Sequence, residues 1–156
     1  MRILIAAVGK IRDCPEAELA ADYIKRAAAS GRGLGFKGVD LVEVEARPAG
    51  DPRAEASALY KATPDDARKI LLDERGAEWS SRQLAEKLAK WRDDGQAHAV
   101  FWIGGADGVS QSVRDTADEK LAFGRQTWPH RLVRVMICEQ IYRAVTILSG
   151  NPYHRD

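Results

Sequence analysis

The chain has 156 residues, with 24 Lys plus Arg against 23 Asp plus Glu, so its formal net charge is +1. This length fits one ordinary domain. A hydrophobic content of 45% with 30% charged residues excludes an intrinsically disordered chain. The charge balance argues against a protein that coats DNA or RNA indiscriminately.

The two cysteines, Cys14 and Cys138, belong to no CxxC or Cys/His cluster, so we expect neither a metal site nor a disulfide. No stretch approaches the roughly 20 apolar residues of a membrane span. The N-terminal apolar run is interrupted by Gly9-Lys10, which argues against a signal peptide. We therefore expect a soluble cytoplasmic protein with no metal and no membrane partner.

The first half of the chain alternates between strand and helix patterns. A β-branched apolar run predicts a buried parallel strand, and a helical spacing of apolar residues begins at Pro15 and ends at the glycines from Gly31. Two prolines and a glycine then mark a surface loop before an alanine-rich helix. The predicted elements are a strand at 3–8, a helix from 15, a strand at 39–45, a loop at 47–52 and a helix up to 62.

The second half continues the alternation. Ser80 or Ser81 can cap a helix that Asp94-Gly95 ends, and the pattern before Asn151 is the best amphipathic helix in the chain. The predicted elements are a strand at 69–73 with a turn at Gly76, a helix from 80 or 81, a strand at 97–103, a helix at 110–121, a strand at 131–135 and a helix at 136–148. The whole predicts a single α/β domain, residues 1–156, with a mostly parallel sheet and helices on both faces.

Glycines follow the predicted strand that ends at Ile103, in the sequence Gly104-Gly105-Ala106-Asp107-Gly108. In open α/β sheets, ligands bind at the carboxyl ends of strands, where glycines let a ligand approach the backbone. The pattern is neither GxGxxG nor a phosphate loop, so it does not indicate a dinucleotide or nucleoside triphosphate. Taken alone, it predicts a binding loop or a plain tight turn.

A second cluster spans residues 124–134 and holds a glycine, Trp128, Pro129, His130 and several arginines. Aromatic and guanidinium groups suit stacking on a base and contact with phosphate. The alternative is a core tryptophan beside solvated arginines. A third cluster is the tail, Asn151-Pro152-Tyr153-His154-Arg155, which is either a frayed end or a source of a histidine for acid–base work.

The C-terminal part of the chain resembles the RlmH-type methyltransferases of the bacterial large ribosomal subunit. The resemblance lies in the order of three segments, which are Ile103 to Gly108, Trp128 to Val135, and Glu139 to Ala144 followed by the tail at 151–155. The resemblance extends over essentially the whole chain. It implies the SPOUT class, an α/β fold with a trefoil knot near the C-terminus, which is a rare exception to unknotted chain topology. It also implies a homodimer that uses S-adenosylmethionine to methylate N3 of a pseudouridine in helix 69 of 23S rRNA on the assembled ribosome.

By position, the resemblance also assigns residues to the methyl donor and to catalysis. The residues expected to bind the donor are Leu72, Gly104, Gly105, Gly124, Arg125, Gln126, Thr127, Trp128 and Pro129. This chain departs from the usual family pattern at Ala106-Asp107 and at Arg131, where proline-containing sequences are common in relatives. The departures concern the geometry of the two loops.

N3 of pseudouridine carries an imide proton, and it becomes a good nucleophile only as that proton leaves. We therefore expect a base and cations near the tail. His154 is the candidate base or hydrogen-bond partner, while Arg155 and Arg143 are candidates to stabilise the developing anion. Tyr153 would orient the substrate, and Glu139, one helical turn before Arg143, would orient Arg143 or a histidine.

Two other functions stay open at this point. One is a knotted methyltransferase that acts on another RNA nucleotide, and the other is a ribosome-binding factor without catalysis. The local charge suits an RNA partner, since five arginines (125, 131, 134, 143 and 155) against Glu139 and Asp156 give the C-terminal segment a charge of 5 − 2 = +3. We expect no DNA partner. A local cationic site suits recognition of one formed RNA surface.

Overall fold

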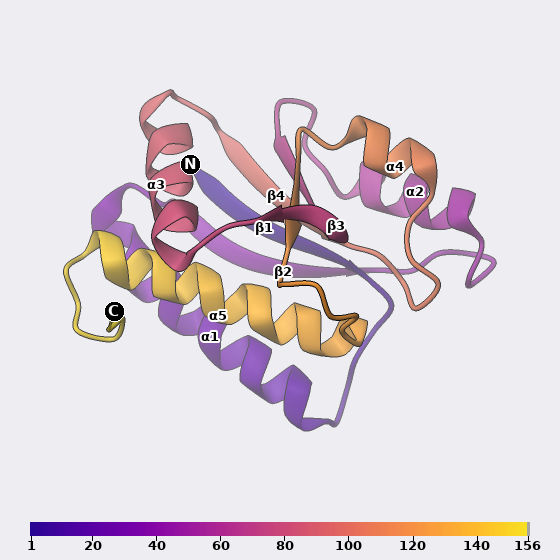
Figure 1. The fold of residues 1–156 in the computed structure, drawn as a ribbon, viewed down its shortest axis with the longest axis horizontal. Coiled ribbons are helices and arrows are strands. Elements are labelled where there is room, and N and C mark those ends of the chain that lie inside the picture. Colours follow the sequence, from indigo (N-terminus) through magenta and orange to yellow (C-terminus); the bar gives the residue numbers. More distant parts are fainter. Residues whose placement is uncertain (156) are drawn as a thin grey trace.

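The computed structural model describes residues 1–155 and shows an α/β fold built on a parallel sheet (Figure 1). The strand order is β2-β1-β4-β3-β5, and every pairing is parallel. The strands are β1 (Arg2–Val8), β2 (Gly38–Val44), β3 (Arg68–Glu78), β4 (His98–Ile103) and β5 (Glu119–Ala122). The helices are α1 (Pro15–Gly31), α2 (Pro52–Lys61), α3 (Ser81–Asp93), α4 (Gln111–Thr116) and α5 (His130–Leu148), with one 3-10 turn, η1 (Arg32–Leu34). The predicted fold class is confirmed.

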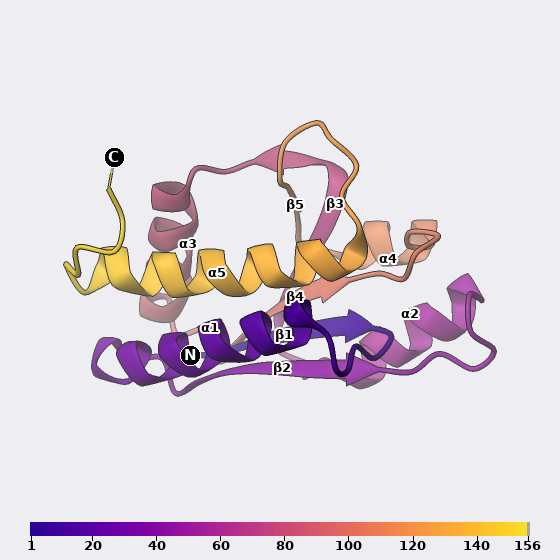
Figure 2. The ribbon, with the colours of Figure 1, turned by 90° about the horizontal axis from the view of Figure 1, so that it is seen from below.

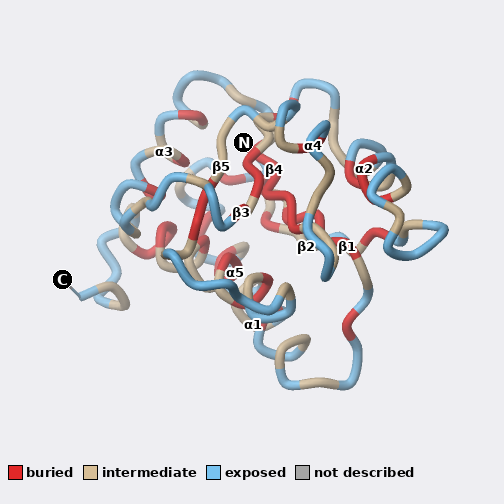
Figure 3. Tube along the Cα trace, turned by 45° about the vertical axis from the view of Figure 1, so that its right-hand side comes forward, coloured by how far each residue is buried: buried red, intermediate tan, exposed pale blue. Residues whose placement is uncertain are grey.

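Helices cover both faces of the sheet, because side chains alternate between the faces along each strand. In β1, Ile3 and Ile5 belong to a buried cluster with α1, α3 and α5, whereas Ala6 and Val8 belong to a second cluster with α2 and α4. Figure 2, seen from below, shows α1 and α5 running side by side in front of the sheet. The strands form the buried centre of the molecule, as Figure 3 shows.

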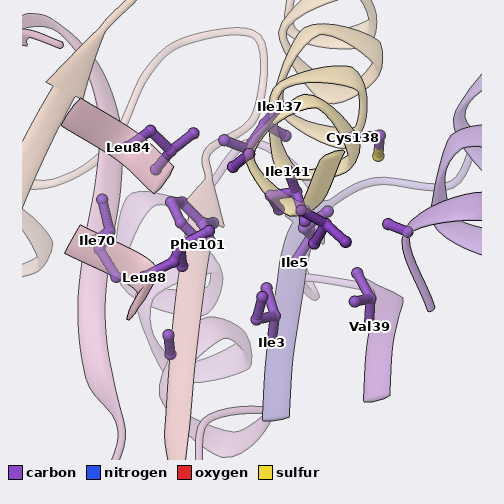
Figure 4. Close-up of a cluster of buried hydrophobic side chains, with 14 of the residues drawn as sticks. Ile3, Ile5, Val39, Ile70, Leu84, Leu88, Phe101, Ile137, Cys138 and Ile141 are labelled. Carbon is purple, nitrogen blue, oxygen red and sulfur yellow. The ribbon is translucent and has the colours of Figure 1, made fainter. Parts of the chain in front are cut away.

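The larger cluster is drawn in Figure 4. Ile5, Phe101 and Ile141 are completely buried there, and α3, on the same face of the sheet, contributes Leu84 and Leu88. Burying one such side chain contributes about 1.5–3 kcal/mol, so this cluster is the main source of stability on the α1, α3 and α5 face. It holds α5 firmly against the sheet.

Side-chain caps set the starts of three helices. Asp51 accepts hydrogen bonds from the N–H groups of Arg53 (2.7 Å) and Ala54 (3.1 Å), which begins α2. Ser80 and Gln83 form a reciprocal capping box at α3, which confirms the predicted serine cap and places it at Ser80. Ser110 caps α4.

Two predicted elements are wrong. The helix expected at 110–121 ends at Thr116, because Asp118 pairs with the edge of β3: its N–H donates to Lys69 O (2.9 Å), and its carboxylate accepts from Lys69 N (2.7 Å). The chain then forms β5. The strand expected at 131–135 is instead the beginning of α5, where the buried face of the helix overrides the local preference of Val133 and Val135 for a strand.

Gly76 does not turn the chain, as the sequence had suggested, but lies inside β3. The pairing of β3 with β5 shifts register between Leu72 and Ala77. A Cβ on Gly76 would lie 2.7 Å from the backbone nitrogen of Leu121, so only glycine permits β5 to come this close. Residues 73–76 therefore form an irregular segment of β3 between its two sets of pairings with β5.

Within residues 1–155, no helix combines the length and apolar character needed to cross a bilayer. The same residues contain no group of three or more His, Cys, Asp or Glu side chains placed to hold a metal ion.

Candidate active site

A cavity of about 710 Å³ opens at the carboxyl ends of three adjacent strands, β3, β4 and β5. Leu72, Ile103 and Ala122, one from each of these strands, line it. The glycine loop at 104–108, the segment 73–75 and the loop at 123–129 form the remaining walls, together with the start of α5. This is the position at which open α/β sheets bind ligands.

The irregular segment of β3 supplies a buried acid to this cavity. Asp73 accepts hydrogen bonds from the backbone N–H of Arg75 (2.9 Å) and from Nε of Arg114 (2.7 Å), and Arg114 also donates to Val109 O. Burial by itself would raise the pKa of Asp73, but these hydrogen bonds and the Arg114 charge outweigh it and lower the pKa. Asp73 therefore stays ionised at neutral pH and ties β3, α4 and the glycine loop together.

The loop between β5 and α5 is closed by its own side chains. Trp128 donates from Nε1 to Phe123 O (2.9 Å), and Thr127 donates to Glu74 Oε2 (3.0 Å). Gly124 has a φ of 86°, which glycine adopts without strain. Trp128 is 40% exposed, so it is not the core residue of the alternative interpretation. The loop forms an ordered rim over the cavity.

The C-terminal tail folds back on α5 and forms a second polar cluster. Glu139 Oε1 accepts from Arg143 Nε (2.9 Å) and Nη2 (2.5 Å) and from the Tyr153 hydroxyl (3.0 Å). Arg143 also contacts His154 Nδ1 at 3.3 Å and lies over the Tyr153 ring, 4.9 Å from its centroid. Gln140 donates to the other oxygen of Glu139 (2.8 Å). The predicted helical pair of Glu139 and Arg143 is thus confirmed.

Electrostatics in this cluster favour fixed charges on Arg143 and a neutral phenol on Tyr153. The hydrogen bond to Glu139 raises the pKa of Arg143. Burial raises the pKa of Tyr153, as do its hydrogen bonds with Tyr23 and Glu139. The guanidinium has no acceptor, so His154 Nδ1 must accept the hydrogen bond from Arg143. A neutral His154 then carries its proton on Nε2.

Comparisons with known proteins identify the family. The family model described as "Predicted SPOUT methyltransferase" matches residues 1–154. The chain belongs to the SPOUT methyltransferase family. It is 54% identical to "Ribosomal RNA large subunit methyltransferase H" of Paracoccus denitrificans, with all of both chains covered. Proteins of the same name from Hyphomonas neptunium (52% identity, 99% of each chain) and Caulobacter vibrioides (53%, 100% of this chain and 99% of the relative) are similar to it over their full length.

The fold also resembles a solved structure described as a probable methylase family protein from Haemophilus influenzae. The TM-score is 0.50 at 12% identity, with 99% of this chain and 70% of the other covered. At this identity the likeness concerns the fold alone. The family assignment rests on the model match and the curated relatives.

Members of the SPOUT family take their methyl group from S-adenosylmethionine, and the first cavity fits such a group. Its volume accommodates a nucleoside-sized ligand, and Leu72, Leu121 and Trp128 give it apolar and aromatic walls. A Cβ on Gly104 would lie 2.4 Å from Val109 Cγ1, and one on Gly105 2.5 Å from Glu55 Oε1, so a larger residue at either position would displace a neighbouring side chain. With glycine, the backbone itself forms the wall. We call this cavity the donor cavity.

The structure brings eight of the nine predicted donor-binding residues to the donor cavity, and the ninth, Arg125, is exposed in the rim loop without lining it. The eight are Leu72, Gly104, Gly105, Gly124, Gln126, Thr127, Trp128 and Pro129. The sequence did not point to Asp73 and Arg114, which line the same cavity, and it indicated His130, a third lining residue, only as part of the cluster at 124–134. Asp73-Glu74, directly after a buried strand, was the available signal for the first of these.

The catalytic candidates lie elsewhere in the SPOUT chain. His130 lines the donor cavity at the start of α5, but Arg143 follows 13 residues later, roughly 20 Å further along the helix. Figure 2 shows the C-terminus at the end of α5 opposite to the rim loop. Glu139, Arg143, Tyr153 and His154 come together there, with Arg155 exposed beside them. One chain therefore does not join the two clusters.

The local positive charge is smaller at the surface than the sequence count suggested. Arg134 is completely buried and pairs with Glu43 at 2.5 Å, and Arg143 pairs with Glu139. Arg125, Arg131 and Arg155 are exposed, while Asp156 lies outside the described residues. Three exposed arginines, rather than five, form the cationic surface of this segment.

Proposed function

We propose that the chain methylates N3 of a pseudouridine in helix 69 of 23S rRNA on the assembled ribosome, with S-adenosylmethionine as donor. The observation that carries this proposal is the full-length similarity, at 52 to 54% identity, to three proteins named as large-subunit ribosomal RNA methyltransferases. The donor cavity at the strand ends supports it. Such an enzyme works in the cytoplasm, with ribosomal RNA as partner and neither DNA nor a membrane.

The donor cavity would hold the donor through the backbone of Gly104, Gly105 and Gly124 and through contact with Leu72 and Trp128. Gln126, Thr127 and Pro129 would shape the rim. When bound, the donor supplies an electrophilic methyl group attached to a positively charged sulfur. What the chain itself must then supply is a site that holds N3 of the pseudouridine in line with that methyl group.

The tail cluster would remove the imide proton and stabilise the resulting anion. Arg143, held by Glu139, and Arg155 would place positive charge beside the developing negative charge on the base. Tyr153 would orient the ring, and His154 would accept the proton from N3. Because His154 Nδ1 accepts a hydrogen bond from Arg143 in this structure, it serves as the base only after that contact is released.

A homodimer would join the two clusters. Within one chain the tail cluster lies roughly 20 Å along α5 from the donor cavity, as far as the helical rise implies. Leu19 on α1, Trp128 in the rim loop and Leu132 on α5 are exposed at 45%, 40% and 40%. Apolar side chains of this size on adjacent elements suit a protein interface. The tail of one protomer would then face the donor cavity of the other.

The family's trefoil knot is part of the same proposal. Two placements support the knot. β5 lies at the edge of the sheet beside β3, and α5, which follows after a short loop, packs against α1 and α3 on one face of the sheet. The rim loop at 123–129 lies between these two elements and closes over the donor cavity.

Transfer of a labelled methyl group tests the proposal. Intact ribosomes, free large subunits and ribosomes that lack the pseudouridine would be compared as substrates, with the modified nucleoside identified by mass spectrometry. We expect label in N3-methylpseudouridine of intact ribosomes. Labelling of transfer RNA alone would indicate another RNA target, and donor binding by calorimetry without transfer to any RNA would indicate a non-catalytic factor.

A further inference from the structure

A second cavity of about 500 Å³ adjoins the donor cavity. It opens at the ends of β1 and β2, between the loop at 45–50, α2 and the start of α5. Gly105, Ala106 and His130 line both cavities, so a ligand in the second would lie directly beside a ligand in the first. The proposed reaction requires this adjacency, because the accepting nitrogen must touch the methyl group.

A buried carboxylate lines the second cavity. Glu55, in the first turn of α2, is only 7% exposed, and its Oε2 accepts a hydrogen bond from the Gly105 N–H at 3.3 Å. Within residues 1–155 this is its only hydrogen-bond donor, and no cation forms an ion pair with it. The helix N-terminus offers partial compensation. A buried carboxyl group with a single hydrogen bond has acceptor capacity left over, which points to an N–H or O–H group that arrives with a ligand.

The mouth of the second cavity suits a nucleotide. Lys10 and Arg47 line it with side chains that are 43% and 88% exposed, and both pair with the exposed Glu45 (2.8 and 3.5 Å). Exposed pairs of this kind are weak, so a phosphate can compete for the two cations. His130 lines the same cavity; burial and the charges of Arg134 and Arg131 lower its pKa and outweigh the opposing charge of Glu55, so its ring is neutral at pH 7.

We propose that the second cavity binds the target nucleotide and that Glu55 accepts a hydrogen bond from N1–H of the pseudouridine ring. This inference rests on the function proposed above. Pseudouridine carries N–H groups at N1 and N3, on either side of one carbonyl, whereas N1 of uridine is bonded to the ribose. With N3 directed at the donor cavity, N1–H is free to meet the carboxylate. Glu55 thus makes the site specific for pseudouridine and exchanges no proton.

Glu55→Gln tests the assignment without changing the size of the side chain. Its amide oxygen can keep the Gly105 contact, and its NH₂ group then faces the cavity and opposes N1–H. We expect kcat/KM for pseudouridine ribosomes to fall roughly 10- to 100-fold. We expect transfer to ribosomes with uridine at the target, which offers no N1–H, to be slower and to be unchanged by the substitution, so the ratio of the two rates falls by the same factor. Glu86→Gln, an exposed carboxylate on α3, is the matched control and should leave the ratio unchanged.

Ribosomes with 1-methylpseudouridine at the target test the same contact with the unaltered protein, and they should react roughly 10- to 100-fold more slowly than pseudouridine ribosomes. Equal rates on these two substrates, or an unchanged ratio in a Glu55→Gln protein that still binds S-adenosylmethionine in calorimetry, would overturn the role of Glu55. If the unaltered protein labels no ribosome at all, the proposed function fails instead, which separates the two outcomes.

Discussion

The donor cavity and the tail cluster are built in opposite ways. The donor cavity is made of loops at the ends of three strands, and backbone atoms of glycines form much of its wall. The tail cluster is made of polar side chains that satisfy one another on a single helix and the segment after it. The difference teaches that the sheet and its loops fix the shape of the donor cavity. The charged side chains of the tail cluster, in contrast, hold one another in place and can act together on a ligand bound by another protomer.

The largest effect we expect comes from Arg134, which fixes α5 beneath both cavities. It pairs with Glu43 and donates to the carbonyls of Val8 (3.4 Å) and Gly9 (2.9 Å), with no side-chain exposure. Arg134→Ala leaves Glu43 without its cation, so the free energy of unfolding should fall by about 3–5 kcal/mol. Urea denaturation measures this. Arg131→Ala, at an exposed position, should stay within about 0.5 kcal/mol of the unaltered protein.

Arg143→Ala separates the two regions by function. Methyl transfer should fall roughly 10²- to 10³-fold, because the cation that stabilises the anionic base is lost. The dissociation constant for S-adenosylmethionine should not change, since Arg143 does not line the donor cavity. Single-turnover transfer and calorimetry measure the two quantities. A parallel loss of donor affinity would contradict the functional separation of the two regions. Lys61→Ala, at the exposed end of α2, serves as the control.

Gly76→Ala should lower the affinity for S-adenosylmethionine, which Arg143→Ala should leave unchanged. The new methyl group would collide with the backbone of Lys120 and Leu121, so β5 must move and the wall of the donor cavity with it. The free energy of unfolding should fall by about 1–3 kcal/mol, and donor affinity should fall too. Gly33→Ala, whose Cβ would meet nothing within 4 Å, should change neither quantity. Donor binding that survives Gly76→Ala would contradict the role assigned to the irregular segment of β3.

The smallest effect concerns pH. Burial lowers the pKa of His130 from its ordinary value of 6.5, with help from the charges of Arg134 and Arg131. The unfolded chain therefore binds the proton first as the pH falls, so the contribution of His130 to stability is complete above pH 6.5 and is lost below it. Urea denaturation between pH 5 and 7.5 should show this slope, and His130→Gln should reduce it. An unchanged slope would assign the effect to other groups.

The glycine loop could be predicted, because an apolar run followed by glycines predicts a buried strand and, after it, a loop whose backbone a ligand can approach closely. β5 could not, since its four residues have little apolar content and their pairing with β3 begins at the contact of Asp118 with Lys69, 49 residues away in the sequence. Nor could the start of α5, where β-branched residues favour a strand locally. The tail residues were recognised by resemblance, but their separation from the cavity follows only from α5 being one unbroken helix.

The register shift in β3 also limits how this chain can vary in length. Residues 73–76 occupy the span between two separate sets of pairings with β5, one ending at Leu72 and the other beginning at Ala77. Deleting one of these residues would not shorten a free loop; it would force one set of pairings out of phase and turn its side chains to the opposite face. We therefore expect insertions and deletions among homologues to be excluded here.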